Sequence, residues 1–132
     1  SLSGYLWLAR RMSDPGSLGF AEAFNFGPGV NAAASVLDLA QAFLEVWPGK
    51  YEVVPQADAD QEAAHLNLSI DKAVAVLDWL PTWGFREAVS QTASWYRQRH
   101  VSLSHDMSEY SMSQIAGFAR DAAAIGIEWA KA

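Results

Sequence analysis

Apolar residues in the first twelve positions recur every three or four residues, which is the spacing of one face of an α-helix. They are Leu2, Tyr5, Leu6, Ala9 and Met12. The segment SDPGS at 13–17 contains Pro and Gly and predicts the end of this helix.

A second helix is expected from residue 36, where apolar residues follow the same spacing. They are Val36, Leu39, Ala40, Phe43 and Trp47, and Leu37 and Leu44 widen the stripe. Ser35 followed three residues later by Asp38 is typical of a capped helix start, because each side chain can accept a hydrogen bond from the free backbone N–H groups there.

Three further helices are indicated downstream. Asp71 favours the first turn of one, whose buried edge is Ala73, Val74 and Leu77 and which Pro81 must end. The next helix is expected to start at Gly84, which caps it, with Glu87 near its third position. One face of this helix holds Phe85, Ala88, Val89, Thr92 and Tyr96.

The last helix is expected to start at SMSQ, residues 111–114, which resembles a capping box. One side of this helix holds Ile115, Ala116, Ala119 and Ala123, and Gly126 weakens its end.

Short extended runs lie between these helices. The segments at 21–27, 50–56 and 64–70 read as strands, because they are apolar or alternate and end in turn residues. The expected fold class is therefore α+β, mainly α, with about five helices and a few short strands in a single domain over 1–132. Strands this short form a small sheet against the helices, or at least one of them pairs outside this chain.

The amino-acid composition disfavours several classes of function. The 132 residues carry 9 Lys and Arg against 15 Asp and Glu, a net charge of −6 that disfavours binding to nucleic acid and to anionic membranes. The absence of Cys excludes disulfides and thiol chemistry. No apolar run approaches the length of a membrane span and no targeting segment is visible, so a cytoplasmic location is expected.

Few residues suggest catalysis. The three histidines, His65, His100 and His105, lack metal-ligand spacing, and no serine lies in a nucleophile motif. The turn GPGVN at 27–31 could present backbone amides to a phosphate or be a plain tight turn. Trp79 and Trp83 flank Pro81 and either pack the joint between two helices, which is favoured, or form a sugar clamp.

Five segments in order carry a resemblance. They are LSGYLWLARRM, AFNFGPG, SVLDLAQAFLEVWPG, EAAHLNLSIDKAVAVLDWLPTWGFREAVSQTASWYR and SMSQIAGF. Together they resemble the C-terminal portion of the CDP-glucose 4,6-dehydratases, a family of extended short-chain dehydrogenases/reductases, over residues 2–118. Residues 119–132 extend beyond the family pattern.

The resemblance implies a two-part enzyme, in which an N-terminal Rossmann domain binds NAD and a small C-terminal lobe closes over the nucleotide sugar. This sequence matches only the small lobe, so it implies no cofactor in this chain and a CDP-sugar as its ligand. The implied substrate-binding residues are Asn31, Gln61 and Glu62. The family's His and Asp correspond here to Gln61 and Ser69, which changes the implied pocket.

Three hypotheses follow from this resemblance. The chain is an isolated substrate-binding lobe without catalytic activity of its own, because hydride transfer needs a cofactor site. Alternatively it is a homo-oligomeric interaction module derived from that lobe, or one part of a split NAD-dependent dehydratase completed by a Rossmann-domain partner.

Overall fold

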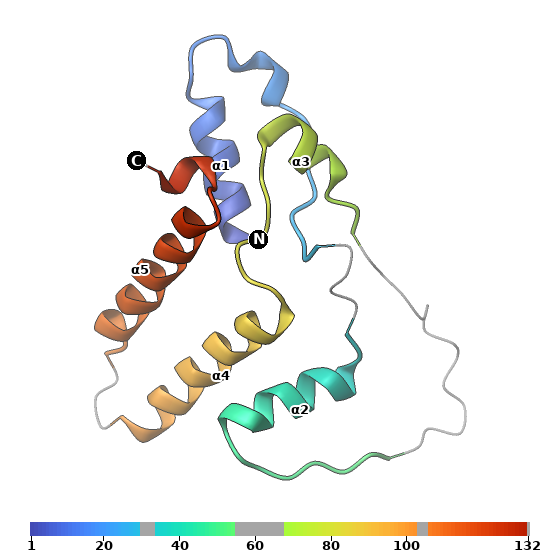
Figure 1. The fold of residues 1–132 in the computed structure, drawn as a ribbon, viewed down its shortest axis with the longest axis vertical. Coiled ribbons are helices and arrows are strands. Elements are labelled where there is room, and N and C mark those ends of the chain that lie inside the picture. The colour runs from blue at the N-terminus through green and yellow to red at the C-terminus, as the bar shows by residue number, and fades with distance from the viewer. Residues whose placement is uncertain (30–33, 55–67, 103–105, 132) are drawn as a thin grey trace.

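The chain is mainly helical (Figure 1). The computed structural model describes residues 1–29, 34–54, 68–102 and 106–131. Over these ranges it forms α1 (Leu2–Met12), η1 (Ser17–Phe20), α2 (Val36–Val46), α3 (Asp71–Leu77), α4 (Phe85–Val101), α5 (Ser108–Ala124) and η2 (Glu128–Ala130). Helices α1 and α3 lie at one end, α2 and α4 lie at the other, and α5 runs along one side from α4 towards α1 (Figure 1).

The core lies where α3 meets α1 and the segment around Phe26. Its buried members are Phe26, Ile70, Ala73, Leu77 and Trp79, with Trp7, Leu8, Phe20, Phe24 and Val74 packed around them. Trp79 is 1% exposed, and its ring meets that of Phe26 edge to face at a centroid distance of 5.0 Å. The Trp79 Nε1 donates a hydrogen bond to Ser3 Oγ at 3.2 Å, which fastens the end of α3 to α1.

The expected strands are wrong for the described residues, since 21–27, 50–54 and 68–70 contain no strand. The first and third segments do lie side by side, because Asn25 Nδ2 donates to the carbonyl of Ser69 at 3.2 Å. Phe26 and Ile70 are fixed there by burial rather than by a backbone ladder, and an isolated two-stranded pair is marginal in water. Val53 and Val54 stay 67% and 76% exposed. Residues 55–56 and 64–67 of the expected strands lie outside the described residues.

The helix boundaries agree closely with expectation in α1, α2 and α3. The capping box is confirmed, because Ser35 Oγ accepts from the Asp38 amide and the Asp38 carboxylate accepts from the Ser35 amide. Helix α3 ends at Leu77, before Pro81, with Asp78 in the left-handed region at φ 49°.

The expected start of α5 is wrong. The helix begins at Ser108, so SMSQ lies inside its second turn, and the Asp106 carboxylate accepts from the Ser108 amide instead. The expected buried side is also wrong: Ile115 is 59% exposed, whereas Ala122 is fully buried. In α4 the expected face is confirmed at Val89, which is buried, but Ala93 beside that face is also buried and Tyr96 is exposed.

Trp79 and Trp83 are scaffold residues, but they fasten different parts of the fold. Trp79 belongs to the core between α1 and α3. The Trp83 ring instead meets Phe118 of α5 edge to face at 4.8 Å, and its Nε1 donates to the Asp121 carboxylate at 2.8 Å. The linker around Pro81 therefore joins α3 to α4 and also places α5. 

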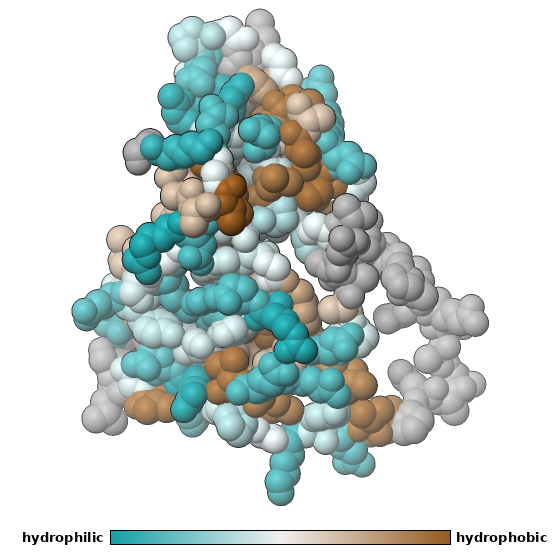
Figure 2. Space-filling model, in the orientation of Figure 1, coloured by the Kyte–Doolittle hydropathy of each residue, from teal (hydrophilic) through white to brown (hydrophobic). Residues whose placement is uncertain are grey.

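The apolar stripe of α1 faces solvent. Leu2, Tyr5 and Leu6 are 78%, 59% and 73% exposed, while the opposite side of the helix places Gly4 against the Phe26 ring. Apolar side chains also gather over α3 and along the edge beside α2 in Figure 2. A helical stripe normally faces a core; here Tyr5 meets the Phe26 ring edge to face at 5.2 Å, whereas Leu2 and Leu6 remain largely exposed.

Candidate functional site

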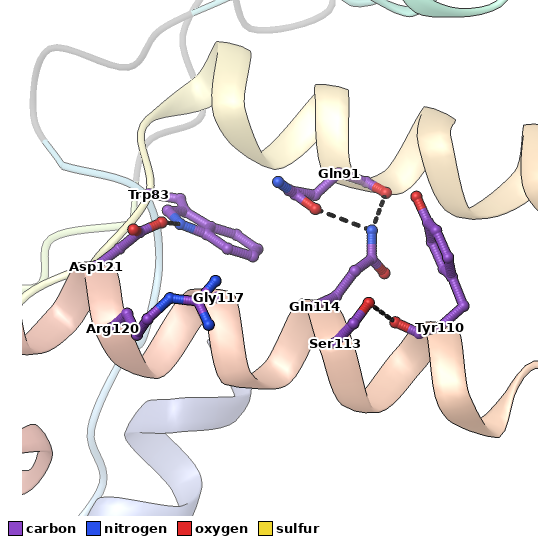
Figure 3. Close-up of a pocket in the computed structure, with 8 residues that line it drawn as sticks. All are labelled: Trp83, Gln91, Tyr110, Ser113, Gln114, Gly117, Arg120 and Asp121. Atoms are coloured by element: carbon purple, nitrogen blue, oxygen red, sulfur yellow. Dashed lines mark hydrogen bonds between the residues drawn. The ribbon is translucent and has the colours of Figure 1, made fainter.

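A hollow lined by polar and aromatic side chains lies between α4 and α5 (Figure 3). Its volume is about 270 Å³. It is lined by Trp83 from the linker, Gln91 from α4, and Tyr110, Ser113, Gln114, Gly117, Arg120 and Asp121 from α5. Drug-sized ligands occupy pockets of about 300–1,000 Å³, so this cavity, called here the α4–α5 cavity, suits one small ring.

Trp83 forms a fixed wall at one end of the cavity. Its ring is held by the edge-to-face contact with Phe118 and by the hydrogen bond from Nε1 to Asp121. Phe118 in turn stacks on Trp129 of η2, with ring centroids 5.8 Å apart. The indole therefore points into the cavity from a packed support and needs little reordering to meet a ligand.

An amide pair fixes the middle of the cavity. Gln114 Nε2 donates to the Gln91 carbonyl oxygen at 2.7 Å and to Gln91 Oε1 at 2.9 Å. Gln91 Nε2 is itself held by Glu87 at 2.8 Å. Because these bonds use the Gln114 amino group, the Gln114 Oε1 remains an acceptor in a fixed position.

The charges in the cavity cancel. Arg120 and Asp121 contribute one positive and one negative side chain, and the carboxylate accepts the Trp83 N–H. Arg120 forms no hydrogen bond or ion pair with another described residue, so its five N–H donors remain available. A Cβ placed on Gly117 would lie 3.7 Å from an Arg120 terminal nitrogen, which shows that the guanidinium lies close above the glycine.

A second hollow lies between α2 and α4, and its charges are already used. Glu45 and Arg86 form an ion pair at 3.0 Å across it. Asp38, also in its lining, is engaged by Ser35, and this hydrogen bond lowers the pKa of the Asp38 carboxyl below its usual value. Phe85 is the one aromatic residue in the described lining of this hollow, and fewer of its polar side chains are free to bind a ligand.

The substrate-binding residues expected from sequence, Asn31, Gln61 and Glu62, lie outside the described residues, as do His65 and His105. His100 lies at the end of α4, with its ring 5.2 Å from that of Trp47. Gly27, at the start of the GPGVN turn, is buried beside Leu68 and Ile70.

Sequence reasoning considered Trp83 but missed its neighbours on α5. The signal was a polar stripe rather than an apolar one: the cavity residues Tyr110, Ser113, Gln114, Gly117, Arg120 and Asp121 recur every three or four positions along α5. Helical spacing places such residues on one face, and a face that carries Tyr, Gln, Arg and Asp around a Gly is suited to a polar ligand.

Within the described ranges, no three His, Asp or Glu side chains are grouped to hold a metal ion. None of the helices found there combines the length and the hydrophobicity required to cross a membrane.

Comparisons with protein-family models, with curated proteins and with solved structures give no match.

Proposed function

We propose that this chain is the substrate-side lobe of a nucleotide-sugar dehydratase of the CDP-glucose 4,6-dehydratase type, and that it has no catalytic activity alone. The observation that supports this proposal is the outward apolar stripe of α1. Leu2 and Leu6 are 78% and 73% exposed although the helix is held firmly from its other side. An apolar stripe of this kind is expected on a lobe whose remaining surface docks on another domain.

The bonds that hold α1 explain why the stripe cannot simply turn inward. Trp7 Nε1 donates to the Leu77 carbonyl at 2.8 Å, Trp79 Nε1 donates to Ser3, and Gly4 lies against the Phe26 ring. Rotating α1 to bury Leu6 would break all three contacts. The stripe is therefore available for a Rossmann-domain partner, which would supply the NAD that the family chemistry requires.

The test is an assay of the purified chain with CDP-glucose and NAD. The proposal expects CDP-glucose to bind, measured by calorimetry, and no conversion of the sugar to occur. A Glu62→Gln variant should bind the nucleotide sugar more weakly, with Glu45→Gln as a matched control elsewhere on the chain. Turnover by the chain alone, or CDP-glucose binding that is undetectable or unchanged in Glu62→Gln, would contradict the proposal.

The second candidate function is a homo-oligomeric interaction module, which the same stripe favours. In that case two copies would bury Leu2 and Leu6 against each other. Light scattering distinguishes the candidates: a Leu6→Glu variant converts an oligomer to a monomer if the stripe joins copies of this chain. A wild-type chain that is monomeric at micromolar concentration removes this candidate and leaves the docking lobe.

A further inference from the structure

We propose that the α4–α5 cavity binds a single neutral sugar ring, as a site separate from any nucleotide-sugar pocket. This inference does not rest on the proposed function, because it uses neither the α1 stripe nor the residues expected to hold a nucleotide. It rests on the size, the charge and the fixed hydrogen-bonding groups of the cavity.

Size indicates that the hollow itself holds a single ring. A cavity of about 270 Å³ lies just under the range for drug-sized ligands. A pyranose fits such a volume, whereas the nucleotide part of a nucleotide sugar would have to lie outside it. The ligand that fills the cavity is therefore one ring, either a free monosaccharide or the terminal sugar of a larger glycan.

Charge favours a neutral ligand. Arg120 is balanced by Asp121 in the lining, and the whole chain carries a net charge of −6. A phosphate or carboxylate would gain from Arg120 but would be repelled by the adjacent Asp121 carboxylate. Hydroxyl groups can instead donate to a carboxylate and accept from a guanidinium, so a neutral polyol satisfies both side chains.

Shape and rigidity favour a ring over a flexible polyol. The Trp83 indole offers an apolar surface on which the C–H face of a pyranose can pack, and it is held in place by Phe118 and Asp121. Gln114 Oε1 is positioned by the bonds to Gln91 to accept from a hydroxyl. The Tyr110 side chain borders the other end of the cavity, as Figure 3 shows, and can donate or accept there.

The test follows the indole N–H signals of the ¹⁵N-labelled chain by NMR during titration with glucose, galactose and mannose. The signal of Trp83 is identified as the one lost in Trp83→Phe. We expect a saturable shift of this signal with at least one sugar, while the signals of Trp7 and Trp79, whose N–H groups are bonded in the core, stay unchanged.

Two variants make the test specific. Gly117→Leu places a side chain in the cavity and, because Leu favours a helix more than Gly does, keeps α5 folded; it should abolish the shift. Arg120→Gln should weaken binding about tenfold, as expected for the loss of a charged hydrogen-bond donor. Arg10→Gln, on α1 and outside the lining of the cavity, is the matched control and should bind as the wild-type chain does.

Methyl glucosides distinguish the two sources of the ligand. Binding of a methyl glycoside indicates the terminal sugar of a glycan, and binding of the free sugar alone indicates a monosaccharide; either result supports the proposal. A shift that survives in Gly117→Leu, the absence of any saturable shift in the wild-type chain, or binding of glucose 1-phosphate in preference to all neutral sugars would overturn it.

Discussion

Replacing Trp79 by Ala should remove a large share of the free energy of unfolding. Trp79 is 1% exposed, and it and Leu77 are the largest fully buried side chains among the described residues. Truncating a buried aromatic residue to Ala typically costs about 3–5 kcal/mol, and the total stability of a domain is only about 5–15 kcal/mol. Since few other large side chains are fully buried here, we expect the loss to lie in the upper part of that range.

The graded variant Trp79→Phe separates packing from hydrogen bonding. Phe keeps a ring to meet Phe26 but cannot donate to Ser3, so the expected cost is about 1–2 kcal/mol, the sum of one hydrogen bond and a small cavity. Ser3→Ala removes the same hydrogen bond and leaves the ring in place. If the two variants share that bond, their effects should not add in the double variant.

The assay is urea unfolding followed by far-ultraviolet circular dichroism, with the free energy taken by linear extrapolation. Leu6→Ala is the matched control, because Leu6 is 73% exposed and also lies next to the core on α1; its effect should stay within about 0.5 kcal/mol. A loss below about 1 kcal/mol for Trp79→Ala, or an equally large loss for Leu6→Ala, would refute the assignment of the core and of the outward stripe.

Three more predictions concern local contacts. Gly4→Ala should destabilise the fold by about 1–3 kcal/mol in the same urea assay, because its Cβ would lie 2.2 Å from the Phe26 ring; an unchanged midpoint would contradict that close approach. Ser35→Ala should cost about 1 kcal/mol through loss of the helix cap, visible as a lower unfolding midpoint, whereas Ser35→Asp, which keeps a capping oxygen, should cost less. The hydrogen bond from the Ser35 hydroxyl lowers the pKa of the Asp38 carboxyl in the folded chain below 3.8. The ionised Asp38 therefore stabilises the fold above that pH, and this stabilisation is lost as the pH falls through the folded pKa. The free energy of unfolding of the wild-type chain, measured against pH, should show this loss, and that of Ser35→Ala should show less of it.

The helices could be predicted because their signals are local. A capping pair such as Ser35 and Asp38 acts within one turn, and Pro81 excludes helix continuation whatever surrounds it. The same reasoning identified Ala73 and Leu77 as the buried edge of α3, because a short helix offers only one face to a core. These features need no knowledge of distant contacts.

Strands and buried faces could not be predicted in the same way because they depend on partners. The segment around Phe26 has the composition of a strand, but it meets Ile70 through side chains and forms no ladder. The apolar stripe of α1 has helical spacing, yet periodicity does not say whether the partner is in the same chain. For α5, Ile115 is more apolar than Ala122, but Ala122 is the residue that lies inside.

The candidate site was only partly visible in the sequence. Trp83 was recognised as a joint residue or a sugar contact, and the structure gives it a packing role against Phe118 and also a place in the lining of the α4–α5 cavity. Arg120 and Asp121 were assigned to an extension beyond the family pattern, although α5 runs without a break through residue 118. Asn31, Gln61 and Glu62 remain predictions, because they lie outside the described residues.

The hydrogen bond from Trp7 to the Leu77 carbonyl has a consequence for synthesis on the ribosome. The two residues are 70 positions apart, and translation adds about 5–20 residues per second. The Leu77 carbonyl is therefore made about 4–14 seconds after Trp7. During that interval the side of α1 that holds Trp7 has no core to pack against, because Leu77 and Trp79 have not been made. Docking of α1 on the core is thus completed only after Leu77 has been translated.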